Sequence, residues 1–310
     1  GYLIDELLKH AMVAEEHEFG LEAHPNVTTP EHLAALAKRG FTRVSYGVQD
    51  FDPKVQDIIN RHQTFEQTKA ITEAARNLGY DSINYDLVFG LPLQTMESVR
   101  DTVEKTIQMM PERIAYYSYA HVPWVSAAQR RYSDDDIPKG EQKRALYETG
   151  RALLKRKDYE DIGMDHFALR HDSLYKAHLG HRLHRNFMGY TTTHTELLIG
   201  LGASAISDAK YAYAQNTKKV EAYSETVASD TLPIFKGHIQ SGEDLDIKRL
   251  IINLSCHGEI HNEDLDLYDS PEINRILREM QNDGILSRKS RGLQVTHSGR
   301  AFIRKICTVF

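Results

Sequence analysis

The 310-residue sequence is poor in cysteine, has no long apolar run and lacks an excess of positive charge. Its two cysteines, Cys256 and Cys307, are too few for a disulfide framework or a thiolate metal site, and they indicate a reducing, cytoplasmic compartment. No apolar run approaches the roughly 18 residues of a transmembrane helix, and the first residues do not resemble a signal peptide, so no membrane partner is expected. The net charge of −6, from 38 basic and 44 acidic residues, gives no support for a nucleic-acid partner.

Two glycine-rich phosphate loops, GxGxxG and GxxxxGK[ST], are also missing, which disfavours dinucleotide and P-loop nucleotide binding. Residues 1–125 instead alternate between short apolar strands and helices that begin at Thr29, Thr64 and Thr95. The predicted strands are 19–23, 43–48, 83–89 and 114–120. This alternation predicts an α/β fold with parallel strands and right-handed crossovers, either a doubly wound sheet or a barrel.

The rest of the chain differs from this repeat. Residues 126–242 are expected to form a mostly helical α+β extension that contributes to the mouth of the active site. Residues 243–310 read as helix, helix, hairpin, helix, which resembles a winged-helix module. This module has 11 acidic and 10 basic residues, so a packing or lid role is favoured over DNA binding.

Histidines are concentrated between residues 166 and 194, which contain six of the sixteen in the chain. His178, His181 and His184 are spaced three apart, and on a helix the outer two do not share one face. A zinc site also needs a further ligand and supporting hydrogen bonds. No metal site is therefore expected within this chain.

Polar residues follow successive predicted strands. Glu22, Gln49 and Asp86 stand at three strand ends, and the turn at residues 119–121 follows the fourth strand. In an α/β barrel these ends meet at one mouth, where ligands bind. The alternative is that each residue only caps a strand or a helix.

Several motifs occur in an order that resembles one known family. They are Leu21-Glu22-Ala23-His24-Pro25, Ser45-Tyr46-Gly47-Val48-Gln49-Asp50-Phe51, Asn84-Tyr85-Asp86-Leu87-Val88-Phe89-Gly90-Leu91-Pro92, Tyr119-Ala120-His121-Val122-Pro123, Gly163-Met164-Asp165-His166-Phe167, the segment 183–192, Gly202-Ala203-Ser204-Ala205-Ile206-Ser207 and Tyr213-Ala214-Gln215-Asn216. Along essentially the whole chain the sequence resembles the radical S-adenosylmethionine barrel of oxygen-independent coproporphyrinogen III oxidases. The resemblance implies a partial (β/α) barrel with about four of its six units.

One departure from the family concerns its CxxxCxxC loop, whose thiolates hold a [4Fe–4S] cluster. Neither this loop nor the glycine-rich strand that follows it is found in the sequence. Both would lie upstream of Gly1. We therefore expect a family member without its first two βα units, inactive alone.

The resemblance implies a reaction and its partners. The family binds two S-adenosylmethionine molecules and a [4Fe–4S] cluster that an electron donor reduces, and it generates a 5′-deoxyadenosyl radical. The radical converts two propionates of coproporphyrinogen III to vinyl groups, giving protoporphyrinogen IX in haem biosynthesis. The full-length protein is expected to be a monomer.

The resemblance also assigns candidate site residues. Glu22 and Ile206 match contacts to the cluster-bound S-adenosylmethionine, and the other molecule has matches at Gln49, Arg61, Asp86 and Ala120. A carboxylate such as Asp86 can accept hydrogen bonds from ribose hydroxyls or an ammonium, and Arg61 offers a forked donor to a carboxylate. The candidates for the substrate's propionates are Arg130, His184 and Arg185. No catalytic residue is identified.

Two alternatives remain open on the same sequence. The first is a haem chaperone built on the same scaffold, against which the segment 183–192 favours the oxidase. The second is a binding module without a cluster. A CxxxCxxC motif encoded upstream of Gly1 would separate a truncated enzyme from such a module.

Overall fold

The computed structural model describes residues 1–310, and the chain divides into two compact units, Gly1–Tyr175 and Lys176–Phe310. The sequence predicted a first break near residue 125. The break lies later because residues 159–169 form two strands that join the first sheet.

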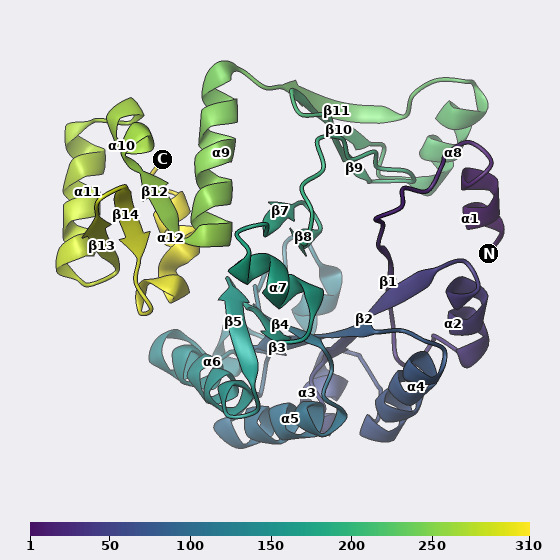
Figure 1. Cartoon of the computed structure of the whole chain (residues 1–310). Coiled ribbons are helices and arrows are strands. Elements are labelled where there is room, and N and C mark those ends of the chain that lie inside the picture. Colours follow the sequence, from purple (N-terminus) through teal and green to yellow (C-terminus); the bar gives the residue numbers. More distant parts are fainter. The chain divides into compact units, whose positions relative to one another are not determined.

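The first unit contains a six-stranded sheet of order β1-β2-β3-β4-β6-β5 (Figure 1). The first four strands are parallel, as predicted. Strands β6 and β5 form a hairpin, and β6 pairs antiparallel with β4, so the sheet is mixed. The bounds are β1 (Phe19–Ala23), β2 (Phe41–Gln49), β3 (Ser82–Phe89), β4 (Arg113–Ser118), β5 (Tyr159–Gly163) and β6 (His166–Leu169).

Helices connect the parallel strands and begin where the sequence predicted. Thr29, Thr64 and Thr95 each cap a helix with a hydroxyl that accepts a backbone N–H hydrogen bond. The N-terminal helix is short and ends at Leu7. The helices are α1 (Tyr2–Leu7), α2 (Pro30–Ala37), α3 (Pro53–Ile58), α4 (Phe65–Asn77), α5 (Met96–Met109), α6 (Gly140–Lys155) and α7 (Ser173–Leu179).

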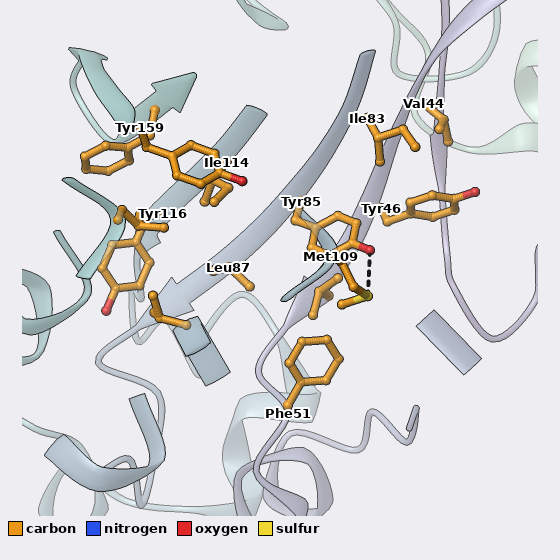
Figure 2. Close-up of a cluster of buried hydrophobic side chains, with 14 of the residues drawn as sticks. Val44, Tyr46, Phe51, Ile83, Tyr85, Leu87, Met109, Ile114, Tyr116 and Tyr159 are labelled. Carbon is orange, nitrogen blue, oxygen red and sulfur yellow. Dashed lines mark hydrogen bonds between the residues drawn. The ribbon is translucent and has the colours of Figure 1, made fainter. Parts of the chain in front are cut away.

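The core of this unit lies between the helices and one face of the sheet. Alternate residues of β2, β3 and β4 point into it, and Figure 2 shows Tyr46, Tyr85 and Tyr116 among them. Tyr85 donates a hydrogen bond to Sδ of Met109 at 3.2 Å, so α5 is fixed to this face (Figure 2). Because side chains alternate along a strand, the residues between these tyrosines lie on the opposite face of the sheet.

Strand β1 is an edge strand, because within this chain it pairs only with β2. The α1 helix lies near this edge. Ile4 packs against the core, and Arg39 donates two hydrogen bonds of 2.6 Å to the carboxylate of Asp5.

Residues 126–242 contain more strands than was expected for a mostly helical α+β extension, and several of these strands lie in the second unit. The second unit has a hairpin of β7 (His184–Asn186) and β8 (Gly189–Thr191). It also has an antiparallel sheet of order β11-β10-β9, formed by β9 (Ile206–Asp208), β10 (Ala212–Asn216) and β11 (Ile234–Ile239), with α8 (Val220–Ala228) between β10 and β11. Strands of three residues are too short to show a period of two in the sequence.

The C-terminal part of this unit combines helices with a small antiparallel sheet. It contains four helices and a three-stranded sheet of order β12-β14-β13, and β13 and β14 form the predicted hairpin. The elements are α9 (Gly242–His257), β12 (Glu259–His261), α10 (Asn262–Leu267), α11 (Pro271–Asn282), β13 (Leu286–Lys289), β14 (Gly292–Val295) and α12 (Ile303–Cys307). No helix of the chain combines the length and the apolar character that crossing a membrane requires.

Candidate functional site

The register of the parallel strands places polar residues side by side on the face opposite the core. Glu22 of β1 lies opposite Ser45 of β2, and Ser45 lies opposite Asn84 of β3. Two residues further along, Gly47 lies opposite Asp86. Asn84 donates hydrogen bonds to Oγ of Ser45 at 3.0 Å and to Oδ1 of Asp86 at 2.9 Å, which fixes the Asp86 carboxyl group.

The end of β2 is bent at Gln49. The pairing with β3 shifts between Gly47 and Gln49, and Gln49 has a φ of 68°, in the left-handed region that non-glycine residues rarely adopt. Such a bulge changes the direction of a side chain at a strand end. The strain at Gln49 must be held by neighbouring contacts.

Arg61 reaches the same place from the loop after α3. Its Nη2 donates a short hydrogen bond to the carbonyl oxygen of Gly47. A Cβ atom added at Gly47 would lie 2.8 Å from Nη2 of Arg61 and 3.0 Å from Nε2 of Gln49, so the glycine makes room for both side chains. The Nε of Arg61 is buried without a hydrogen-bond partner.

The charges at this place influence one another. Burial raises the pKa of Asp86 to about 6, and the negative charge of Glu22 adds to the rise, whereas the Asn84 hydrogen bond and the Arg61 charge oppose it. Burial lowers the pKa of Arg61, and Asp86 opposes this shift. The structure therefore brings Gln49, Arg61 and Asp86 together, with the exposed Glu22 within electrostatic range.

No role was assigned to Asp50 from the sequence, yet its buried carboxylate supports the strand ends at this site. The carboxylate of Asp50 is fully buried and accepts hydrogen bonds from Asp52 N at 2.6 Å, from Nε2 of Gln94 at 2.5 Å and from Oγ1 of Thr102 at 2.8 Å. Gln94 also donates to the carbonyl oxygen of Val88 at 2.8 Å. One carboxylate thus connects the ends of β2 and β3 with α5.

Two amides support the same backbone. Gln56 donates to the carbonyl oxygens of Asp50 and Gln63, both at 2.8 Å, and Gln63 donates to the carbonyl oxygen of Val48. The residues on both sides of Gln49 are therefore fixed by buried hydrogen bonds. The only sequence signal for this network was polar residues next to apolar strand ends.

The remaining candidates of the first unit follow β4. Ala120 is exposed, and its carbonyl oxygen accepts a hydrogen bond of 3.4 Å from Gln129. Lys143 donates to the carbonyl oxygen of the preceding residue, Tyr119, at 2.6 Å. Arg130 is exposed and donates to the carbonyl oxygen of Pro123 at 3.0 Å, so its guanidinium is engaged with its own loop and is not brought to Asp86.

The other three candidates belong to the second unit. Ile206 lies in β9 and His184 and Arg185 in β7. Burial, with the charges of His194 and Lys248, lowers the pKa of His184 to about 4, so at neutral pH His184 offers no positive charge to a carboxylate. Arg185 is the cation of this pair.

The residues present do not fit a [4Fe–4S] cluster. Such a cluster requires three thiolates in this family, and the chain has two thiols. Burial raises the pKa of Cys256 to about 11 and also raises that of Cys307, which disfavours the thiolate form at both. The S-adenosylmethionine candidates do fit, because a buried guanidinium N–H without a partner stands beside a fixed carboxyl group.

The chain is similar to known proteins along nearly its whole length. The family model of the radical SAM superfamily matches residues 1–106. Oxygen-independent coproporphyrinogen III oxidases from Pseudomonas aeruginosa and Paracoccus denitrificans are each 37% identical, over 99% and 96% of this chain and 69% and 67% of their own lengths. A solved coproporphyrinogen III oxidase from Escherichia coli, described as a radical SAM enzyme, superimposes with a TM-score of 0.92 at 35% identity, over 99% of this chain and 73% of its own.

Proposed function

Since the chain belongs to the oxygen-independent coproporphyrinogen III oxidase family, we infer that it acts in the oxidative decarboxylation of coproporphyrinogen III with S-adenosylmethionine. The reaction turns two propionates into vinyl groups. The radical chemistry is supplied by the [4Fe–4S] cluster and its cofactor, and this chain has no ligand set for that cluster. The role of its own residues is therefore to bind ligands.

The observation that carries the proposal is the convergence of Arg61, Gln49 and Asp86 around Gly47. In our proposal Arg61 holds the carboxylate of one S-adenosylmethionine molecule, and its unpartnered Nε is the donor that such a ligand would satisfy. Asp86 accepts hydrogen bonds from the ribose hydroxyls or the ammonium group. Gln49 and the backbone at Ala120 complete this contact set.

The second cofactor contact set is less complete within this chain. Glu22 stands on the edge strand β1, and Ile206 lies in the second unit. We propose both as contacts of the cluster-bound S-adenosylmethionine. A reducing, cytoplasmic compartment and an external electron donor are part of the same proposal, and both cysteines of the chain are free thiols.

The titration of Asp86 gives a test of this assignment. Its pKa of about 6 means that the carboxyl group is ionised at pH 7.5 and largely protonated at pH 5. A neutral carboxyl attracts a cationic ligand less and loses acceptor capacity. We expect the affinity for S-adenosylmethionine to fall as the pH decreases through about 6, with calorimetric titrations between pH 5 and 8 as the measurement.

The Asp86→Asn variant should bind more weakly at pH 7.5 and should lose this pH dependence. Asp101→Asn, which changes an exposed carboxylate of α5, is the matched control and should keep the wild-type profile. A wild-type profile in Asp86→Asn would remove Asp86 from the site.

A further inference from the structure

One face of the β9–β10–β11 sheet forms the floor of an open groove in the second unit. Ile206, Gln215 and Lys236 lie opposite one another across the three strands, and Asp208, Tyr213 and His238 form the next row. Since residues two apart share a face, both rows point the same way. The elements are visible in Figure 1.

Two hollows of about 370 Å³ and about 330 Å³ cover this face, and both are lined by Phe187, Tyr213 and His238. The first is also lined by Ile206 and Lys236. The second extends to Arg185 and to apolar residues of α9. The two hollows thus form one groove with a largely apolar lining, in the size range of sites for organic ligands.

Aromatic rings lie in the middle of this groove. Phe187 is 52% exposed and packs edge-on against Tyr213, with ring centroids 5.2 Å apart. An exposed phenylalanine over an apolar hollow offers a contact surface for the rings of a ligand. This geometry favours a flat or ring-containing organic molecule over an ion.

Two positive charges of the groove have no acidic partner. Lys248 pairs with Asp208 at 2.8 Å, so its charge is already compensated, and Nε2 of His238 lies 3.1 Å from Oδ2 of Asp244. Arg185 and Lys236 form no ion pair.

Arg185 is also held in place. Its guanidinium lies 4.8 Å from the ring centre of Tyr190, and the Tyr190 hydroxyl donates to the carbonyl oxygen of Ser255 at 2.6 Å. The Nη1 of Arg185 is buried without a hydrogen-bond partner. A buried donor without an acceptor is costly, so a ligand carboxylate would stabilise this arrangement.

We propose that this groove binds the tetrapyrrole substrate, with Arg185 pairing with one propionate and Lys236 with another on either side of Phe187 and Tyr213. The proposal rests on the proposed function. An apolar macrocycle with four carboxylates matches an apolar groove with two uncompensated cations. Ile206, proposed above as a cofactor contact, lies in the same row as Lys236.

The test is a fluorescence titration of the 310-residue chain with coproporphyrin III, a stable oxidised form that keeps the four propionates. We expect Arg185→Met to weaken binding about tenfold, since a charge-assisted pair is lost, and Lys236→Met to weaken it about threefold to tenfold. Arg275→Met, which changes an exposed arginine of α11, is the control and should bind like the wild type.

Three outcomes would overturn the proposal: no binding by the folded wild-type chain, equal affinities of the wild type and Lys236→Met, or an equal loss in Arg275→Met. Lys236 is exposed on β11, so its substitution leaves the fold intact and keeps the test decisive if Arg185→Met unfolds. Binding of S-adenosylmethionine is measured separately. Its failure would count against the proposed function, whereas failure with coproporphyrin alone would count only against the groove.

Discussion

Replacing Asp50 by alanine is expected to lower the free energy of unfolding by about 3–5 kcal/mol, because several buried donors lose a charged acceptor at once. The donors are Asp52 N, Gln94 Nε2 and Thr102 Oγ1, and the Asp50 side chain is completely buried. The same substitution should weaken S-adenosylmethionine binding, since Gln49 would no longer be held in its left-handed conformation.

Urea unfolding of the wild type and Asp50→Ala measures this effect, with S-adenosylmethionine binding as a second readout. Asp57→Ala is the matched control, because Asp57 is an exposed carboxylate of the neighbouring helix α3, and it should change the unfolding free energy by less than about 0.5 kcal/mol. If Asp50→Ala were as stable as Asp57→Ala, the network would not hold the two strand ends.

The second large effect concerns the cluster. We expect the 310-residue chain, incubated with iron and sulfide under reducing conditions, to incorporate no stoichiometric [4Fe–4S] cluster. The two thiols of the chain cannot replace three thiolates, and burial raises the pKa of both. Without the cluster, reductive cleavage of S-adenosylmethionine should not occur, although binding at Arg61 and Asp86 should remain.

Iron analysis and electron paramagnetic resonance of the reduced sample measure this directly, and 5′-deoxyadenosine formation provides a chemical readout. The double variant Cys256→Ser, Cys307→Ser should contain the same background iron as the wild type. A stoichiometric cluster that disappears in the double variant would show that the two cysteines do bind a cluster.

Local sequence patterns were sufficient for the first four strands and their helices. The threonine caps at 29, 64 and 95 and the alternating apolar residues of β2 and β3 act within a few residues of the chain. The pairing of β6 with β4 depends on contacts between residues about fifty positions apart. Such contacts leave no periodic signal, so the mixed sheet and the later end of the first unit were not predicted.

The candidate site was predicted in part. The resemblance identified Gln49, Arg61 and Asp86, and the structure places them around Gly47. Asp50 lies within one of the family motifs but received no role, because its partners Gln94 and Thr102 are more than forty residues away. Lys236 was missed for the same reason, since only the sheet register places it in the same row as Ile206, with Gln215 between them.

Calorimetric titration of the wild type, Arg61→Ala and Arg100→Ala tests whether the carboxyl ends of β2 and β3 with Arg61 form an S-adenosylmethionine site. The wild type should bind S-adenosylmethionine, and Arg61→Ala should bind more weakly by about 1–3 kcal/mol because a charge-assisted hydrogen bond is lost. Arg100→Ala, which removes an exposed arginine of α5, should bind like the wild type. Equal affinities of the wild type and Arg61→Ala, or no binding by the folded wild-type chain, would contradict an S-adenosylmethionine site at Arg61 and these strand ends.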